Sequence, residues 1–300
     1  MGSEQEFEQK FEKDGESRLE MMAPLAQAYV RSVQERPADG GLFGPQSLVW
    51  RVHRDRSFPV AGMRSLMVQA LHPLAMAGVA QHSDWKRDPF GRLTATSGYV
   101  LTVTYGDTAA ARAAAARVRA VHTHVRGTDE VTGLDYSAAD PELLLWVHAG
   151  MVDSILTIVQ RYGRGLDAAE ADLYVAEMVP FAEIVGVPAE MVPTSVKALR
   201  EYLESVDLRQ ATPAARDAIG IVLDPPGLTD DFRELWHDIG QVAIGSLPAW
   251  ARSMYGFAEP PAEMMEREPV RQLIGALDLA FESLPGVLEA RERIELRMRA

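Results

Sequence analysis

The sequence predicts an all-α fold organised as a single globular domain. Nearly every segment has the apolar spacing or the composition of a helix, and the one strand-like run, Val100 to Tyr105, is short. A chain of 300 residues with 47% hydrophobic content can form one large core. Because no shift in composition marks a convincing boundary, we expect one main domain.

The start of the chain is predicted to be an N-terminal helical region, residues 1–36, which precedes the main helical domain, residues 37–300. The segment from Glu4 to about Glu35 is charged at first and amphipathic later, and Pro37 with the glycines after it ends the helical pattern. The short segment from Leu42 to His53 that follows is compatible with either a helix or a loop.

The segment from Arg64 to Gln81 is apolar nearly all round, which predicts a buried helix. Proline removes a backbone donor, so we expect Pro73 to kink this helix beside His72. His72 is then either a hydrogen-bonded core residue or part of a pocket wall. His82 stands at the end of the segment, where histidines with a shifted pKa are common, and it is a candidate site residue.

The next segments lead to the helix around which we expect the chain to be organised. In Gly91 to Tyr105, Arg92 and Thr96 are four residues apart, so a helix would project both side chains from one face. Asp107 to Gly127 consists mostly of alanine and arginine, which are among the best helix formers. Its first or second residue is expected to cap the helix, and its last residue, a glycine, to end it.

Arg119, His122 and Arg126 lie near the end of this predicted helix. The arginines stand three residues before and four residues after the histidine, so all three side chains would share one face. This pattern suits a haem, because an imidazole ligates iron and guanidinium groups pair with propionates. The alternative is a basic helix end that the helix dipole favours, with a histidine that is not a ligand.

The second half of the chain is also predicted to be helical. Glu142 to Tyr162 is a long amphipathic helix that Asp140 caps, and His148 on it is either a pocket residue or a core histidine with a hydrogen-bond partner. The later predicted helices are Asp167 to Val185, Thr194 to Leu203, Asp230 to Ser246, and Arg267 to the end with a break near Pro285. We expect Arg64–Gln81, Asp107–Arg126 and Glu142–Tyr162 to form a globin-like helical core around a haem pocket.

The pattern R-x-x-H-x-x-x-R at Arg119, His122 and Arg126 resembles the haem-ligand helix of the latex clearing protein (rubber oxygenase) family, which groups with the MpaB-type oxygenases. The resemblance extends over residues 41–193 and is similar to the bacterial, non-rubber branch. Further motifs that carry it are Gly41-Leu42-Phe43-Gly44-Pro45, Leu71-His72-Pro73, Gln81-His82-Ser83, Asp88-Pro89-Phe90-Gly91-Arg92 and Leu144-Leu145-Trp146-Val147-His148.

The resemblance implies a haem b-dependent oxygenase that cleaves or oxidises an apolar, isoprenoid-like substrate with dioxygen. It implies His122 as the iron ligand, Arg119 and Arg126 at the propionates, and Arg92 and Thr96 on the distal side, with His82 as a further candidate. The rubber oxygenases have a lysine just before this threonine, where the present chain has Ala95. Rubber cleavage itself is therefore not expected.

Composition excludes several other classes of function. The chain has no cysteine, which excludes disulfides, thiolate ligands and iron–sulfur clusters. A formal net charge of −13 argues against a nucleic-acid partner. No uninterrupted apolar run reaches the length of a membrane span, and the acidic N-terminal segment lacks the pattern of a signal peptide, so we expect a cytoplasmic protein.

Two alternatives belong to other functional classes. The first is a non-catalytic haem carrier or sensor, in which a second side chain closes the distal side of the iron. The second is a cofactor-free helical protein that binds a small molecule. A hydrolase is disfavoured, because neither a G-x-S-x-G nor an H-E-x-x-H motif is present.

Overall fold

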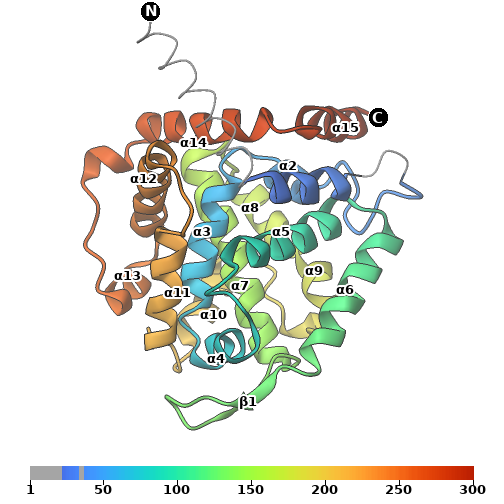
Figure 1. Ribbon diagram of the computed structural model, residues 1–300. Helices are drawn as coiled ribbons and strands as arrows, with labels where there is room; N and C mark the ends of the chain where they lie inside the picture. The colour runs from blue at the N-terminus through green and yellow to red at the C-terminus, as the bar shows by residue number, and fades with distance from the viewer. Residues whose placement is uncertain (1–21, 34–36) are drawn as a thin grey trace, which may run out of the picture.

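Two apolar helices, α3 (Phe58–Gln69) and α7 (Pro141–Tyr162), pack side by side at the centre of the fold (Figure 1). The computed structural model describes residues 22–33 and 37–300. Around the central pair lie the helices α2 (Leu48–His53), α4 (Pro73–His82), α5 (Pro89–Tyr105), α6 (Thr108–His122), α8 (Ala168–Glu177), α9 (Val179–Glu183), α10 (Val196–Ser205), α11 (Pro213–Leu223), α12 (Asp230–Ser246), α13 (Ala249–Tyr255), α14 (Arg267–Glu282) and α15 (Val287–Arg299). Short 3₁₀ turns occupy Ala189–Met191 and Ala262–Met265.

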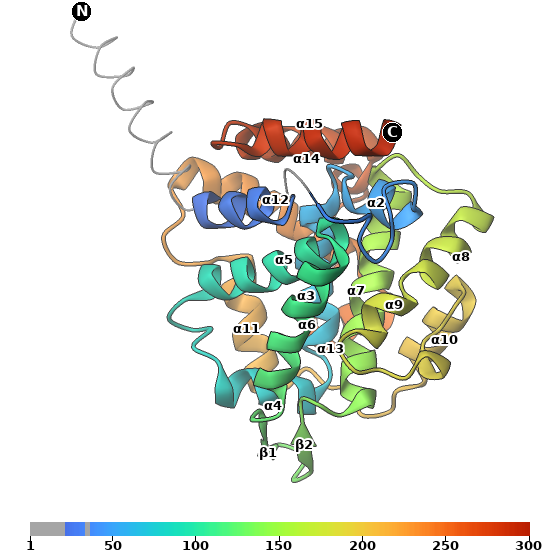
Figure 2. The same ribbon diagram turned by 90° about the vertical axis from the view of Figure 1, so that its right-hand side faces the viewer.

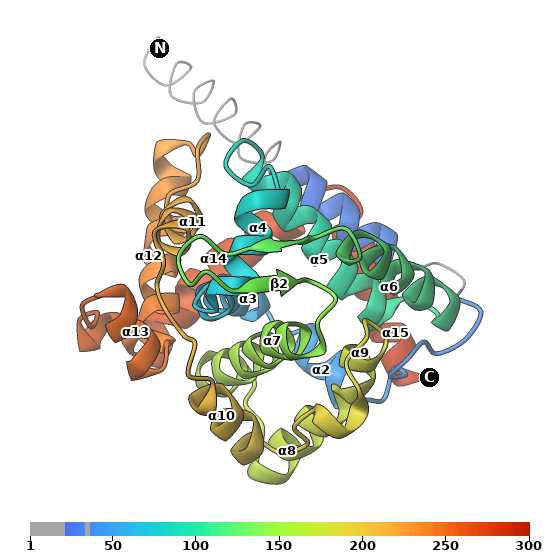
Figure 3. The same cartoon turned by 90° about the horizontal axis from the view of Figure 1, so that it is seen from below.

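Within the described part of the chain, the only strands are β1 (Arg126–Thr128) and β2 (Asp135–Ser137). They form an antiparallel hairpin in which Gly127 lies opposite Tyr136, and Figure 3 shows this hairpin crossing the lower face of the molecule. The prediction of an all-α, single-domain protein is therefore confirmed.

A buried ion pair fastens the central helices together. Arg64 of α3 donates hydrogen bonds to Asp153 Oδ2 (2.8 Å) and Ser154 Oγ (2.7 Å) of α7 and to the carbonyl of Ser246 in α12 (3.0 Å). The exposed fractions of Arg64 and Asp153 are only 2% and 4%. Arg200 of α10 reaches the other oxygen of the same carboxylate at 3.5 Å. One charge pair thus joins four helices.

A second apolar cluster lies beside the main core, and the C-terminal helices cover it. It contains Tyr29 and Val33 from the N-terminal side, Trp50 of α2, Tyr105 of α5 and Ile294 of α15, among other residues. Residues 22–32 are helical. The rest of the predicted N-terminal helical region lies largely outside the described residues, and the division at residue 36 stays a prediction.

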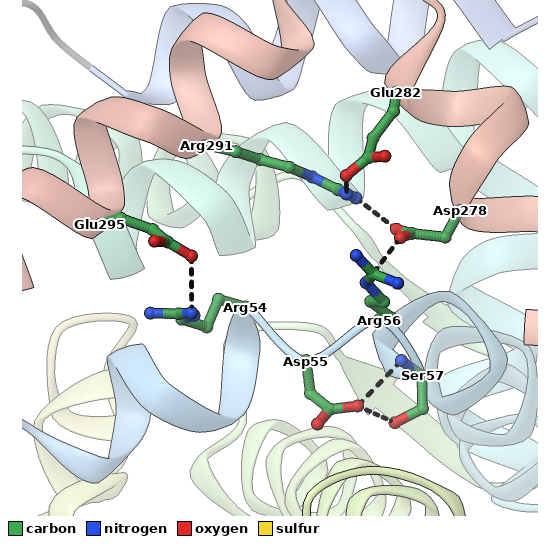
Figure 4. Close-up of polar contacts among 8 residues, drawn as sticks. All are labelled: Arg54, Asp55, Arg56, Ser57, Asp278, Glu282, Arg291 and Glu295. Atoms are coloured by element: carbon green, nitrogen blue, oxygen red, sulfur yellow. Dashed lines mark hydrogen bonds and ion pairs between the residues drawn. The ribbon is translucent and has the colours of Figure 1, made fainter. Parts of the chain in front are cut away.

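Polar contacts hold the C-terminal helices on the turn between α2 and α3 (Figure 4). Arg54 donates to Glu295 Oε1 of α15 at 2.9 Å. Arg56 pairs with Asp278 Oδ2 of α14 at 2.9 Å, and Arg291 of α15 pairs with the other oxygen of the same carboxylate. Because Asp278 is buried, its two arginine partners compensate for a charge that water does not reach.

Proline divides two of the predicted helices instead of kinking them. The segment predicted as one helix from Arg64 to Gln81 forms the end of α3 and the whole of α4. His72 between them is extended and occupies the N-cap position of α4, whose first residue is Pro73; its side chain makes no capping hydrogen bond. The predicted helix from Asp167 likewise ends at Glu177, and α9 begins anew with Pro180 in its first turn.

The organising helix is shorter than the sequence predicted. Asp107 caps it, accepting a hydrogen bond from the amide of Ala110 at 2.8 Å, but α6 ends at His122 and not at Gly127. Arg126 belongs to β1. The expectation that Arg119, His122 and Arg126 share one helical face is therefore wrong for Arg126, because strand pairing with β2 replaces the last helical turn.

The turn between α5 and α6 is fixed by backbone packing. Gly41 has a φ of 77°, and a Cβ atom on it would lie 2.3 Å from the carbonyl oxygen of Gly106, so only glycine fits there. The carboxylate of Asp39 accepts hydrogen bonds from the amides of Gly41 (2.9 Å) and Thr108 (2.8 Å). The loop before α2 thus fastens the start of α6.

Among the described residues, α7 is the one helix whose length and composition would suffice to cross a membrane. Its mean hydropathy is 1.5, and 78% of its apolar window is buried inside the fold. The core helix of a globular domain has these same properties.

We predict that Asp153→Ala lowers the free energy of unfolding by about 3–5 kcal/mol, because it leaves Arg64 charged and unpaired in the core. Denaturant unfolding of the full chain measures this. Asp217→Ala, which removes the partner of the exposed Lys86, is the control and should cost about 1 kcal/mol or less. An Asp153→Ala protein as stable as the control would contradict the prediction.

Candidate functional site

The candidate site lies where α5 and α6 meet, with α9 beside α6 in Figures 2 and 3. Asp88 caps α5 by accepting a hydrogen bond from the amide of Gly91 at 2.8 Å, and Pro89 is its first residue. α5 and α6 are joined by a tight turn and pack against each other, and the charge of Arg92 is close enough to His122 to lower its pKa. Arg92 therefore lies in the neighbourhood of His122.

His122 is half-buried at the end of α6, and its ring has no hydrogen-bond partner among the described residues. Its Nδ1 atom is buried and unpaired. Burial lowers the pKa of His122 below its usual range, and the positive charge of Arg92 lowers it further. The imidazole is therefore neutral near pH 7, with a lone pair free to bind a ligand.

Arg92 is exposed to solvent, yet burial lowers its pKa. Water reaches this side chain, but protein surrounds it on several sides. A guanidinium keeps its charge at any ordinary pH, so Arg92 is a cation. Arg92 Nη1 donates a hydrogen bond to Ser83 Oγ at 2.9 Å.

Arg119 lies one turn before His122 on α6 and connects this helix to α9. It is exposed, and its Nη1 donates to the carbonyl oxygen of Ile184, the residue that follows α9. Neither Arg119 nor Arg92 forms an ion pair with a carboxylate within the described residues. Both guanidinium groups are therefore available to an anion that binds beside His122.

The remaining predicted site residues are placed differently. Thr96 and Ala95 are both exposed on α5, and Thr96 is one turn after Arg92 as expected. Arg126 is exposed on the hairpin. His82 is also exposed, and its Nε2 lies 3.1 Å from the hydroxyl of Tyr136 in β2. His82 directly precedes Ser83, the partner of Arg92. Its own described contact, however, is with the hairpin.

Sequence reasoning missed Tyr99 as a member of the site. It lies three residues after Thr96 and so continues the face of α5 that begins with Arg92. Its hydroxyl is buried without a hydrogen-bond partner, burial raises its pKa to about 12, and the nearby charge of Arg119 opposes that rise. The spacing of seven residues from Arg92 is the signal that could have indicated it.

His148 of α7 is buried, as one of the two sequence readings expected, but its Nδ1 has no partner. The prediction of a core histidine with a hydrogen-bond partner is therefore wrong. Burial lowers the pKa of His148 to about 4, so the ring is neutral. Its ring centroid is 6.1 Å from that of Phe181 in α9, and Tyr99 packs on the same phenylalanine at 5.6 Å. His72, in contrast, packs against Trp146.

His53 at the end of α2 has a hydrogen-bond partner on each ring nitrogen. Thr104 Oγ1 donates to the carbonyl of Val100 at 2.9 Å, so His53 Nδ1 must donate to Thr104 Oγ1 at 2.8 Å. His53 Nε2 then accepts from the hydroxyl of Tyr174 at 3.2 Å. Burial lowers the pKa of His53 to about 3, and its role is structural.

These features define an all-helical domain with a half-buried, neutral histidine beside two cations. The family model of the ER-bound oxygenase mpaB/B′/rubber oxygenase catalytic domain matches residues 50–278. The chain belongs to this family, and it is an oxygenase domain at that level of description. No curated protein and no solved structure matches the chain significantly.

We predict that Arg92→Gln raises the pKa of His122, because a positive charge that opposes imidazolium formation is lost. A pH titration of the histidine ring signals by NMR measures this in the full chain. Arg87→Gln, at an exposed arginine of the α4–α5 turn, is the matched control and should leave the His122 pKa unchanged. An unchanged pKa in Arg92→Gln would show that the two side chains do not share one environment.

Proposed function

We propose that this chain is a haem b-dependent oxygenase in which His122 is the protein ligand of the iron. The observation that carries the proposal is a neutral imidazole that has no hydrogen-bond partner among the described residues and stands one helical turn after Arg119, a guanidinium without a described carboxylate partner. A haem has one iron that accepts an imidazole and two propionates that accept guanidinium hydrogen bonds, so the residues present fit this group.

The donor set also suits a haem better than a bare metal ion. Within residues 22–33 and 37–300, no group of three or more histidine, aspartate or glutamate side chains is arranged to hold an ion. Haem iron needs only one imidazole on its proximal side, because the macrocycle supplies the other ligands. His122 can supply that imidazole.

The proposal assigns roles to three further residues, Arg119, Arg92 and Thr96. Arg119 holds a propionate, while Arg92 and Thr96 on α5 contact dioxygen or the substrate. Bound haem would supply the oxygen chemistry, and the apolar core would exclude water from it. Arg126 is left without a role at the ligand helix, since it lies in β1, and a catalytic role for His82 stays a prediction.

The proposed reaction is oxidative cleavage or oxidation of a carbon–carbon double bond in a small apolar, isoprenoid-like substrate. The family name supports an oxygenase, and the apolar, isoprenoid-like substrate is what the family resemblance implies. A cytoplasmic location stays a prediction.

We predict that His122→Ala loses its haem while the helical fold persists, because alanine has the highest helix propensity and His122 ends α6. Haem content and the Soret band measure the loss, and far-ultraviolet circular dichroism measures the fold. His124→Ala is the matched control, since His124 is exposed and bonds the carbonyl of Ala120. A His122→Ala protein with wild-type haem content and Soret band would refute the assignment.

The ferrous spectrum of the haem-loaded protein tests the oxygenase class itself. A five-coordinate iron that binds carbon monoxide rapidly is the expected result. A six-coordinate iron that excludes carbon monoxide would instead support a carrier or sensor.

We also predict that Ala95→Lys changes ligand binding at the iron without unfolding the protein. Ala95 is exposed and directly precedes Thr96, where the rubber oxygenases have a lysine, so the substitution should add a cation on the distal side. Carbon monoxide affinity and the Soret maximum measure the effect. If both equal those of the wild type, Ala95 does not face the iron and the distal assignment of Arg92 and Thr96 is incorrect.

A further inference from the structure

Tyr99 and His148 form a second polar pair in the candidate site. They come from different helices, α5 and α7, and both rings pack against Phe181 of α9. Arg92, Thr96 and Tyr99 lie on one face of α5, and Tyr99 is the least exposed of the three. The pair therefore lies further inside the protein than the proposed distal residues.

Both polar atoms lack a partner among residues 22–33 and 37–300. Tyr99 Oη and His148 Nδ1 are buried and make no hydrogen bond. Leaving such an atom unsatisfied costs about 1–3 kcal/mol. Other described side chains also have an unpaired buried atom, but Tyr99 and His148 come from two different helices and pack on the same phenylalanine. A ligand at this place would complete the hydrogen bonds of both.

Tyr99 differs in its exposure from two other side chains that have an unpaired buried atom. Trp50 Nε1 and Tyr105 Oη are also buried without partners, in the second apolar cluster. Both of those side chains have an exposed fraction of 0%. Tyr99 is only partly buried, so the side chain that carries its hydroxyl is in reach of a molecule entering from solvent.

The charge state of the pair selects the chemistry of the ligand. A phenol whose pKa is raised to about 12 stays protonated and donates. An imidazole whose pKa is lowered to about 4 stays neutral, with one nitrogen donating and the other accepting. Two neutral groups favour an uncharged hydroxyl or carbonyl, because a buried carboxylate needs a cation to compensate its charge. The cation whose charge reaches Tyr99 is Arg119, and the proposed function assigns it to a propionate.

We propose that Tyr99 and His148 bind the one uncharged polar group, a hydroxyl or a carbonyl, of an otherwise apolar substrate. This inference rests on the proposed function and narrows its substrate class. The substrate is then an alcohol, aldehyde or ketone of isoprenoid-like character, and neither a plain hydrocarbon nor a carboxylic acid.

Three matched probes test the proposal by isothermal titration calorimetry on the haem-loaded full chain: farnesol, its hydrocarbon counterpart farnesene, and ionised farnesoic acid. We expect farnesol to bind about tenfold more tightly than farnesene, the ratio that one neutral hydrogen bond provides. We expect the acid to bind more weakly than farnesol. Equal affinities of farnesol and farnesene would overturn the proposal, as would tightest binding of the acid, which would assign the ligand to Arg119.

Tyr99→Phe and His148→Leu should each bring the dissociation constant of farnesol to the level of farnesene and leave farnesene binding unchanged. Neither variant loses an internal hydrogen bond, so the Tm should stay equal or rise. Tyr174→Phe is the matched control, because its hydroxyl bonds His53: its Tm should fall while the preference for farnesol persists. Survival of the preference in both site variants would overturn the proposal.

A Tm of Tyr99→Phe that falls as far as that of Tyr174→Phe would also overturn it, by showing that the phenol has an internal partner. The outcomes separate this inference from the proposed function. A chain that binds no haem through His122 but still prefers farnesol refutes only the haem assignment. A chain that retains haem through His122 without this preference refutes only the role of Tyr99 and His148.

Discussion

The buried contact between Arg64 and Asp153 is the constraint on which the rest of this fold depends. A charge at this depth is tolerated only with its partner in place, so α3 and α7 have one acceptable register. The same pair holds α12 through a backbone carbonyl and α10 through Arg200. Because α7 is fixed in this way, the opposite side of the same helix presents His148 toward α9 at a defined place.

The candidate site joins this rigid centre to a less embedded helix. Packing between elements joins α6 chiefly to α5, and its contact with α7, which the sequence suggested as a core neighbour, is slight at most. Its position depends on the Asp39 contacts at one end and on the hydrogen bond from Arg119 to α9 at the other. A group bound between α5, α6 and α7 would therefore have the firmly fixed α7 on one side. On another side it would have α6, which is held mainly at its two ends.

Local signals in the sequence were sufficient for the helices but not for their long-range contacts. Capping by Asp107 and Asp140 follows from side-chain chemistry within one turn, and these two helices begin where expected. The error at Arg126 has a different origin, because the pairing of β1 with β2 depends on residues about ten positions later. The influence of Arg92 on His122 likewise depends on tertiary packing, which helical periodicity could not supply.

The charges at the site complete the argument for a bound anion next to a neutral histidine. Arg54, Arg56 and Arg291 have carboxylate partners, as Figure 4 shows. Arg92 and Arg119 bond only a hydroxyl and a carbonyl, respectively. The positive charge of Arg92 also keeps His122 unprotonated. The charge of Arg92 thus keeps the neighbouring imidazole available to a metal, while the propionate contact of the proposed function belongs to Arg119.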